Sequence, residues 1–182
     1  MLNELIAAYR PADADEEADV ARVRALLAAG GDVWSRATPL HVTASALVVH
    51  PASGRVLLRW HARQEAWLQV GGHGDPGETD PVAVALREGA EETGLADLVP
   101  YPDAARAEIV HVVVVPVKAK GDEPAHEHAD VRFVLATGTP EAARPEKPDA
   151  PLRWLTVAEA LELAARSNLR ETIVRAGRLL AA

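Results

Sequence analysis

Gly71–Leu95 reads GGHGDPGETDPVAVALREGAEETGL, and the rest of the chain is organised around this stretch. A glycine-rich loop leads into Asp80-Pro81, which is typical of a helix start because Asp caps free N–H groups and Pro loses nothing at the first helical position. Gly94 suits the left-handed residue that ends many helices. The sequence therefore predicts a helix of about three turns between Asp80 and Gly94.

The two sides of this helix differ in character. Successive residues are about 100° apart, so four positions share one side, which we expect to be buried: Val82, Leu86, Gly89 and Thr93. Glu88, Glu91 and Glu92 share another side, because residues three and four apart are neighbours on a helix. Three carboxylates that close repel one another unless a cation joins them, and clusters of oxygen ligands suit Mg²⁺ or Mn²⁺. We interpret them as a metal site; the alternative is a solvated face on which Arg87 pairs with Glu91.

Gly89 argues against the solvated face. A glycine inside a helix costs roughly 0.5–1 kcal/mol relative to alanine. We therefore expect the apolar side of this helix to pack very close to another backbone at Gly89.

Gly72 to Leu95 resembles the Nudix box, whose pattern is G-x5-E-x7-R-E-U-x-E-E-x-G-U, with U a bulky aliphatic residue. The specified letters are matched by Gly72, Glu78, Arg87, Glu88, Glu91, Glu92, Gly94 and Leu95. There are two departures. Eight residues rather than seven separate Glu78 from Arg87, so either the loop carries one extra residue or Thr79 occupies the acidic position. Gly89 stands where an aliphatic residue is usual.

The resemblance implies an α/β/α sandwich around a mixed β-sheet. It also implies a pyrophosphohydrolase that cleaves a diphosphate bond in a nucleoside diphosphate linked to another moiety, with Mg²⁺ or Mn²⁺ as cofactor. The alternative is a Nudix-fold module that binds or regulates without catalysis. Isopentenyl diphosphate isomerase shares the fold but uses a cysteine, and this chain has none.

The resemblance also assigns roles to residues. Glu88, Glu91 and Glu92 would hold the metal, together with the backbone carbonyl of Gly71. Either Glu88 or Glu92 would act as the base. Arg87 would act within the catalytic site by orienting a carboxylate, for which Glu78 is the candidate; Glu78 is also a candidate for substrate contact.

A second polar motif, GDEPAHEHAD, contains His126 and His128. Residues i and i+2 of an extended segment point to the same side, so both imidazoles could face one ligand. Three interpretations stay open: histidines with no metal role, histidines that touch the phosphate or base of the substrate, and a zinc hydrolase. The last arises because HEHAD resembles the HxHxD of metallo-β-lactamase-like enzymes, although Val131 stands where that motif needs its next His. Glu127 and Glu123 are candidates for an acidic ligand or base outside the box.

Composition narrows the class of protein. A chain of 182 residues, 48% apolar, is long enough for one domain with a substantial core. Its net charge of −8 argues against a nucleic-acid polymer as partner. The apolar runs are too short to cross a membrane, and the start of the chain has no basic segment typical of a signal peptide, so the cytoplasm is the expected location. Arginine outnumbers lysine 16 to 3, which favours a bacterial source.

Residues 1–32 are expected to form a helical N-terminal extension, and residues 33–182 the Nudix-type domain. Asp13 followed by Glu16 is typical of a helix start. The extension is interpreted as a packing or homodimer-forming appendage, with a substrate-contacting lid as the alternative. Strands are predicted at 41–50, 55–60, 67–70, 107–117, 130–136 and 152–155.

Two closing helices are expected to begin at Thr156, with Glu159 completing a capping box, and at Asn168, with Glu171 three residues on. No motif typical of NADH, coenzyme A or dinucleoside polyphosphate hydrolases is present. The sequence therefore leaves the substrate open.

Overall fold

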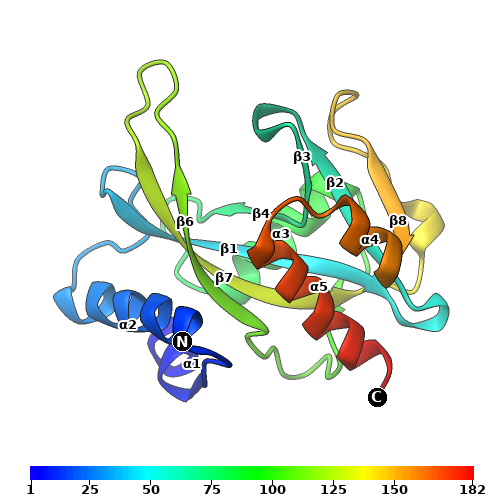
Figure 1. The fold of residues 1–182 in the computed structure, drawn as a ribbon, viewed down its shortest axis with the longest axis horizontal. Coiled ribbons are helices and arrows are strands. Elements are labelled where there is room, and N and C mark those ends of the chain that lie inside the picture. The colour runs from blue at the N-terminus through cyan, green and yellow to red at the C-terminus, as the bar shows by residue number, and fades with distance from the viewer.

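The computed structural model describes all 182 residues as a mixed α/β fold (Figure 1). Its helices are α1 (Leu2–Ala8), α2 (Ala14–Ala29), α3 (Pro81–Thr93), α4 (Val157–Leu163) and α5 (Ser167–Leu180). Its strands form one eight-stranded sheet: β1 (Leu40–His50), β2 (Arg55–His61), β3 (Ala66–Leu68), β4 (Val70–His73), β5 (Val99–Pro100), β6 (His111–Val117), β7 (His126–Ala136) and β8 (Leu152–Thr156).

The long strands β1 and β7 run parallel to each other, with His41 opposite His128. β1 is long enough to pair with two antiparallel strands on its other edge. Its second half pairs with β2 across the turn at 51–54, and its first half pairs with β4. The strand predicted at 67–70 is therefore divided, because β3 continues the hairpin with β2 while β4 turns to β1. This pairing brings the glycine loop beside the first half of β1.

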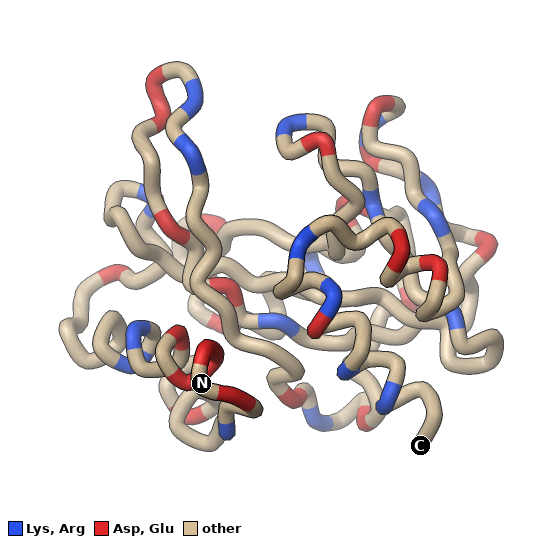
Figure 2. The backbone as a smooth tube through the Cα atoms, viewed as in Figure 1, with Lys and Arg blue, Asp and Glu red and all other residues tan.

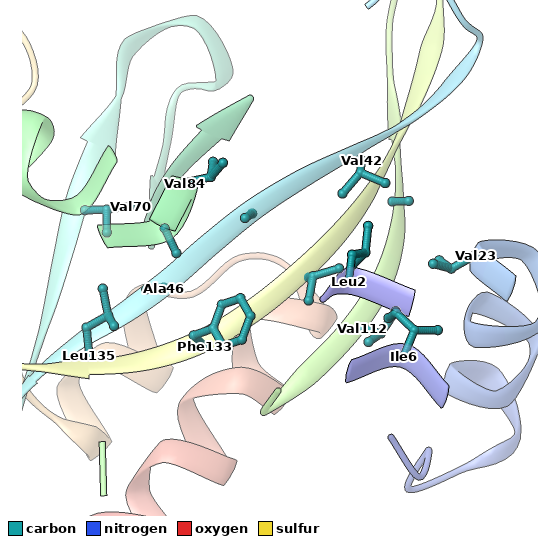
Figure 3. Packing of buried hydrophobic residues seen from close by; sticks show 14 of the residues in the cluster. Leu2, Ile6, Val23, Val42, Ala46, Val70, Val84, Val112, Phe133 and Leu135 are labelled. Atoms are coloured by element: carbon teal, nitrogen blue, oxygen red, sulfur yellow. The ribbon is translucent and has the colours of Figure 1, made fainter. Parts of the chain in front are cut away.

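Side chains alternate between the two faces of a strand, and helices cover both faces of this sheet. On one face, even-numbered residues of β1 and odd-numbered residues of β7 pack against α1, α2 and α3 (Figure 3): Val42, Ala44, Ala46, Val48, Ala129, Val131, Phe133 and Leu135. On the other face, α4 and α5 pack against Leu47, Val49, Val134 and Ala136. Helices on both faces give the α/β/α sandwich that the sequence predicts.

The face that carries α4 and α5 changes character along its strands. Its apolar half lies under those helices. Toward the start of β1 and β7 the same face becomes polar, with these residues in alternate positions: His41, Thr43, Ser45, His126, His128, Asp130 and Arg132. The helical cover of this face therefore ends where its strands become polar.

Helix α3 begins and ends as predicted. The Asp80 side chain accepts a hydrogen bond from the Val82 amide at 3.0 Å, Pro81 occupies the first turn, and Gly94 ends the helix with φ 69°. The predicted buried face is partly wrong. Thr93 and Gly89 are buried, but the other buried positions are Pro81, Val84 and Ala85, and Val82 and Leu86 are only half-buried. The helix is therefore rotated, so that the row through Ala85 and Gly89 faces the sheet.

Gly89 does not lie against another backbone, contrary to the prediction. A Cβ at this position would lie 3.0 Å from a methyl carbon of Leu98 and 3.6 Å from one of Leu135. The close neighbours are thus side chains of the core. A glycine is suited here because it leaves room for these two leucines.

The N-terminal extension forms α1 and α2, and α2 packs beside β6. Four of its residues join the same core cluster as α3: Leu2, Ile6, Val20 and Val23. Asp13 caps α2 as predicted, accepting from the Glu16 amide at 2.9 Å. The Glu16 carboxylate turns inward to Arg175 of α5, 2.9 Å away. The domain boundary at residue 33 stays a prediction.

Thr156 and Glu159 form the predicted capping box at the start of α4. The predicted start of the last helix is wrong: α5 begins at Ser167, and Arg166 stands in the cap position with no side-chain hydrogen bond. Asn168 already lies inside the helix, where its carbonyl accepts from Thr172 at 3.1 Å.

Two strands differ in length from the prediction. β6 begins at His111 rather than at residue 107, and only its first four residues are buried. Val110 lies just before the strand, and its carbonyl accepts a hydrogen bond from Arg175 at 2.9 Å. β7 begins earlier than predicted, at His126, so the GDEPAHEHAD histidines lie in a strand and not in a loop.

Candidate functional site

The three glutamates of α3 project from one side of the helix with unequal exposure. Their side chains are 18% exposed at Glu88, 54% at Glu91 and 12% at Glu92. Glu88 and Glu92 turn toward the sheet, whereas Glu91 lies nearer to solvent. The solvated-face alternative therefore does not describe Glu88 and Glu92.

Strand β4 lies directly against these two carboxylates. The Gly71 amide donates to Oε2 of Glu92 at 3.1 Å. A Cβ on Gly72 would lie 2.6 Å from the carboxyl carbon of Glu88, so any other residue would displace that side chain. Gly71 has φ 143°, and a Cβ there would lie 2.4 Å from the Cα of Ser45. Both glycines let the backbone approach closely, one toward β1 and one toward the carboxylates.

Arg87 ties the glycine loop to the acidic side of the helix. Its guanidinium donates to Oε2 of Glu78 at 2.8 Å, to Glu88 at 3.0 Å and to Glu91 at 3.0 Å. It also donates to the His73 carbonyl at 2.9 Å. Glu78 thus reaches Arg87 despite the extra loop residue, and Thr79 does not take its place. Arg87 is therefore positioned to orient carboxylates.

The electrostatic environment differs among the glutamates. Burial raises the pKa of Glu92 to about 7, against the opposing effects of Arg59, 3.0 Å away, and of the Gly71 amide. Burial also raises the pKa of Glu88, although Arg87 opposes it. A raised carboxyl pKa means that the ionised form lacks compensating positive charge. The donors here are all oxygen, so the residues fit a hard divalent cation such as Mg²⁺ or Mn²⁺.

The carboxylates do not converge on one point in this arrangement. The glutamate oxygens are held by arginines: Glu92 by Arg59, and Glu88 and Glu91 by Arg87. A cation bound by all three would compete with these ion pairs. The arginines therefore fix the positions of the three carboxylates. To bind one cation together, the glutamate side chains would have to move away from these arginines.

A cavity of about 700 Å³ lies on the polar half of the sheet, beside the start of α5. Its wall includes Gly71, Gly72 and His73, whose backbone contacts the glutamates, but the glutamates themselves do not line it. Basic side chains are numerous around it: Arg63, Lys118, Lys120, Arg132 and Arg166. Strand β4 is thus shared between the acidic side chains and a basic cavity.

Asp130 organises the floor of this cavity. Its carboxylate accepts from Ser45 at 2.5 Å, from Thr43 at 3.0 Å and from Arg132 at 2.8 Å. Burial alone would raise the pKa of Asp130, but Arg132 and the hydroxyl groups hold it below its usual value. From the sequence, Asp130 was noted only as the last residue of HEHAD, and Arg132 was not predicted as a site residue. The sequence feature that could have indicated them is the alternation of polar residues along His126–Arg132. These side chains point to one face of β7, and the pairing of β7 with β1 places them beside the polar residues of β1.

His126 and His128 lie side by side, as predicted, with their Nε2 atoms 3.1 Å apart. The structure adds two further histidines: His41 from β1 and His73 from β4, whose Nε2 atoms are 3.0 Å apart. Burial, followed by the neighbouring imidazoles, lowers the pKa of His73 to about 3 and that of His128 to about 4. His73, His126 and His128 line the cavity.

The other predicted acidic residues lie away from the α3 glutamates. Glu127 points to the opposite face of β7 from its histidine neighbours and pairs with Arg22 of α2 at 2.6 Å. Glu123 pairs with Arg63 at 2.5 Å, on the rim of the cavity. Neither contacts Glu88, Glu91 or Glu92 in this arrangement.

Comparisons with known proteins give consistent results. The model of the NUDIX domain family matches residues 39–176. A C. elegans Ap4A hydrolase complex is similar in fold, with a TM-score of 0.60 and 19% identity over 77% of this chain and 97% of that chain. The E. coli dihydroneopterin triphosphate pyrophosphohydrolase has a TM-score of 0.59 and 18% identity over 78% and 96%. A MutT NUDIX hydrolase from Burkholderia pseudomallei has a TM-score of 0.52 and 22% identity over 76% and 98%. No curated protein matches the sequence.

Proposed function

Since the chain belongs to the Nudix family of pyrophosphohydrolases, we propose that it cleaves a diphosphate bond in a nucleoside diphosphate linked to another moiety, with a divalent cation as cofactor. One observation carries this proposal above the others. Glu88 and Glu92 are largely buried against a glycine strand, and burial raises the pKa of both even though Arg87 and Arg59 oppose it, so their negative charge is only partly compensated. A module that only binds nucleotides has no need of carboxylates held in this costly state.

Glu88, Glu91 and Glu92 would hold Mg²⁺ or Mn²⁺, together with the carbonyl of Gly71. A cation held there would supply positive charge against the phosphate groups and would lower the pKa of a bound water molecule. The chain's own residues supply the rest. Arg87 keeps Glu88 and Glu91 in place through hydrogen bonds of 3.0 Å each.

Glu92 is the better candidate for the base. A general base works best when its pKa lies near the working pH, and in the cation-free protein burial raises the pKa of Glu92 to about 7. Its contact with the Gly71 amide fixes one oxygen, and Arg59 holds the other. Glu88, which rests on Gly72, then serves to bind the cation.

The basic cavity would receive the remainder of the substrate. Its arginines and lysines attract phosphate groups, and its wall at Gly71–His73 adjoins the carboxylates. His126 and His128 stand in the same wall and are placed to touch an anionic substrate. Substrate contact by Glu78 or Glu127 is not supported by geometry, because Arg87 and Arg22 respectively engage them.

The charge pattern along the chain bears on the kind of partner. Both signs of charge are interspersed along the chain, without an extended basic stretch (Figure 2), which suits a small-molecule substrate better than a nucleic-acid polymer. None of the helices combines the length and apolar character needed to cross a membrane. We expect the enzyme to act in the bacterial cytoplasm, and a homodimer through the N-terminal extension remains part of the proposal.

The decisive experiment is a screen for turnover. The full chain is incubated with Mg²⁺ or Mn²⁺ and nucleoside triphosphates, nucleotide sugars, dinucleoside polyphosphates, dihydroneopterin triphosphate and non-nucleotide diphosphates, and products are identified by mass spectrometry. We expect cleavage at a diphosphate bond that stops on addition of EDTA. Binding without turnover of any compound would instead support the non-catalytic module.

A further inference from the structure

Four histidines from three strands meet at one end of the sheet. His41 comes from β1, His73 from β4, and His126 and His128 from β7. The potential ligand atoms of His41, His73 and His128 all lie within 4.8 Å of one another, and theirs is the one group of three or more such residues in the molecule. His126 completes the cluster, since its Nε2 is 3.1 Å from that of His128.

Backbone carbonyls fix the tautomer of two of the rings. Nδ1 of His41 lies 2.9 Å from the Thr38 carbonyl, and Nδ1 of His126 lies 2.9 Å from the Pro124 carbonyl. A carbonyl only accepts, so each Nδ1 carries the hydrogen. In the neutral imidazole Nε2 then carries the lone pair, which in His41 faces His73, while Nε2 of His126 lies 3.1 Å from His128 and 3.7 Å from Glu123. Histidines that bind metals are commonly oriented through a backbone carbonyl in this way.

The spacing suits a small ion. Ligand atoms about 2.0–2.1 Å from a tetrahedral zinc lie about 3.3 Å from one another. The Nε2 atoms of His41 and His73 are 3.0 Å apart, and a ligand atom of His128 lies within 4.8 Å of both. The Nε2 atoms of His126 and His128 are 3.1 Å apart. In the metal-free protein, the same distances are explained by one hydrogen bond in each pair, donated by His73 to His41 and by His128 to His126. A measurement of metal uptake distinguishes the metal-bound cluster from the hydrogen-bonded one.

We propose that His41, His73 and His128 bind a zinc-type transition-metal ion, with His126 as a neighbouring ring beside His128. The site is separate from the α3 glutamates in chemistry as well as in position. Imidazole nitrogen suits zinc, whereas carboxylate oxygen suits magnesium and manganese. Each site therefore selects a different metal. The ion adds positive charge to the cavity wall formed by His73, His126 and His128.

Direct measurement of metal uptake tests the proposal. The full chain, prepared without a histidine tag, is stripped with EDTA and titrated with Zn²⁺ against a chromophoric chelator. We expect one Zn²⁺ per chain with a Kd at or below about 1 µM. Co²⁺ in the same site should give the intense visible absorption of tetrahedral coordination. Wild-type protein that takes up no Zn²⁺ at this affinity overturns the proposal, whether or not any variant folds.

Variants locate the ion. His73→Gln and His128→Gln, checked for folding by circular dichroism, should each weaken Zn²⁺ binding by at least about 100-fold. His50→Gln is the matched control, because His50 lies at the opposite end of β1, where its ring contacts Ser53 and the edge of Trp154 and none of the clustered histidines. Glu92→Gln should bind Zn²⁺ as the wild type does even where it abolishes turnover. Zinc lost in Glu92→Gln but kept in His128→Gln would place the ion on the carboxylates and overturn the proposal.

Discussion

Glu16 and Glu92 are both carboxylates in low-exposure positions, 2% and 12% exposed, and each lies next to an arginine at 2.9 and 3.0 Å. Burial alone would raise the pKa of both. In Glu16 that effect is overcome, and the pKa falls below its usual range. In Glu92 it is not overcome, and the pKa rises to about 7. Two Glu–Arg ion pairs thus leave the pKa of their carboxylates shifted in opposite directions.

The difference lies in the number of donors. Glu16 accepts from both terminal nitrogens of Arg175, from the Tyr9 hydroxyl, and from the amides of Ala12 and Val112. These contacts satisfy both oxygens. Glu92 has Arg59 and one amide. A fully satisfied buried carboxylate fastens one part of a fold to another, whereas an under-satisfied one is available to a cation or a proton.

The largest effect is expected at Glu16. Glu16→Gln leaves the largely buried Arg175 with only the more exposed Glu171 as counter-charge, and breaking a buried pair typically costs about 3–5 kcal/mol in the free energy of unfolding. Urea denaturation at neutral pH measures this loss. The matched control is Glu171→Gln, because Glu171 pairs with the same arginine at 2.7 Å but is 38% exposed. A pair so exposed contributes at most about 1 kcal/mol. Equal losses of stability in the two variants would contradict the conclusion that the buried Glu16–Arg175 pair stabilises the fold.

Glu92→Gln should show the reverse pattern. Turnover should fall by at least about 10²-fold, because removal of one electrostatic partner of a transition state typically costs that much. The free energy of unfolding in EDTA should fall by less than in Glu16→Gln, since an under-compensated charge is lost and Arg59 keeps Glu146 at 3.7 Å. We expect the same fall in turnover for Glu91→Gln. Steady-state kinetics and denaturation measure the two effects.

Glu146→Gln provides the control for Glu92. Glu146 lies 3.7 Å from the same Arg59 and is 38% exposed. Its loss should change turnover less than about 3-fold, as for surface substitutions of small energetic effect. A Glu92→Gln variant that keeps wild-type turnover would remove the distinction between the two carboxylates.

The pH dependence of stability sharpens the comparison further. The pKa of Glu16 is depressed in the folded state, so its contribution is fully present above the unfolded value of 4.5 and is lost as the pH falls below it. The stability difference between wild type and Glu16→Gln should shrink below pH 4.5 by up to about 1.4 kcal/mol per pH unit. Denaturation from pH 7 to pH 3 tests this, with Glu171→Gln as reference. A difference that stays constant across the range would show that the carboxylate of Glu16 is not the source of the stability.

Some of these features could be predicted from the sequence, because they are local. Glu88, Glu91 and Glu92 are one turn apart on a single helix, and the Asp80 cap and the Gly94 stop lie within the same stretch. The Nudix pattern adds Glu78 and Arg87, and the structure brings these two together. Short-range rules of helix geometry were sufficient for this part of the site.

Contacts across the sheet could not be predicted in this way. Arg175 lies 159 residues after Glu16, and nothing near either residue marks the pair. His41 and His73 join the other histidines through strand register, since His41 pairs opposite His128 and Thr43 opposite His73. Only the i, i+2 relation of His126 and His128 was visible in advance. Register is fixed by the packing of both faces, which no single segment specifies.

The smallest effect concerns the two helices that carry these carboxylates, since each begins with a capping aspartate. Asp13 accepts from the Glu16 amide at 2.9 Å, and Asp80 accepts from the Val82 amide at 3.0 Å. Asp13→Ala and Asp80→Ala should each lower the free energy of unfolding by about 1 kcal/mol, because one helix N–H loses its acceptor. Asn at either position keeps an acceptor and should restore most of the loss. If Asp13→Ala costs as much as Glu16→Gln, the cap and not the buried ion pair holds the extension in place, and the contrast between Glu16 and Glu92 would have to be reassigned to their helices.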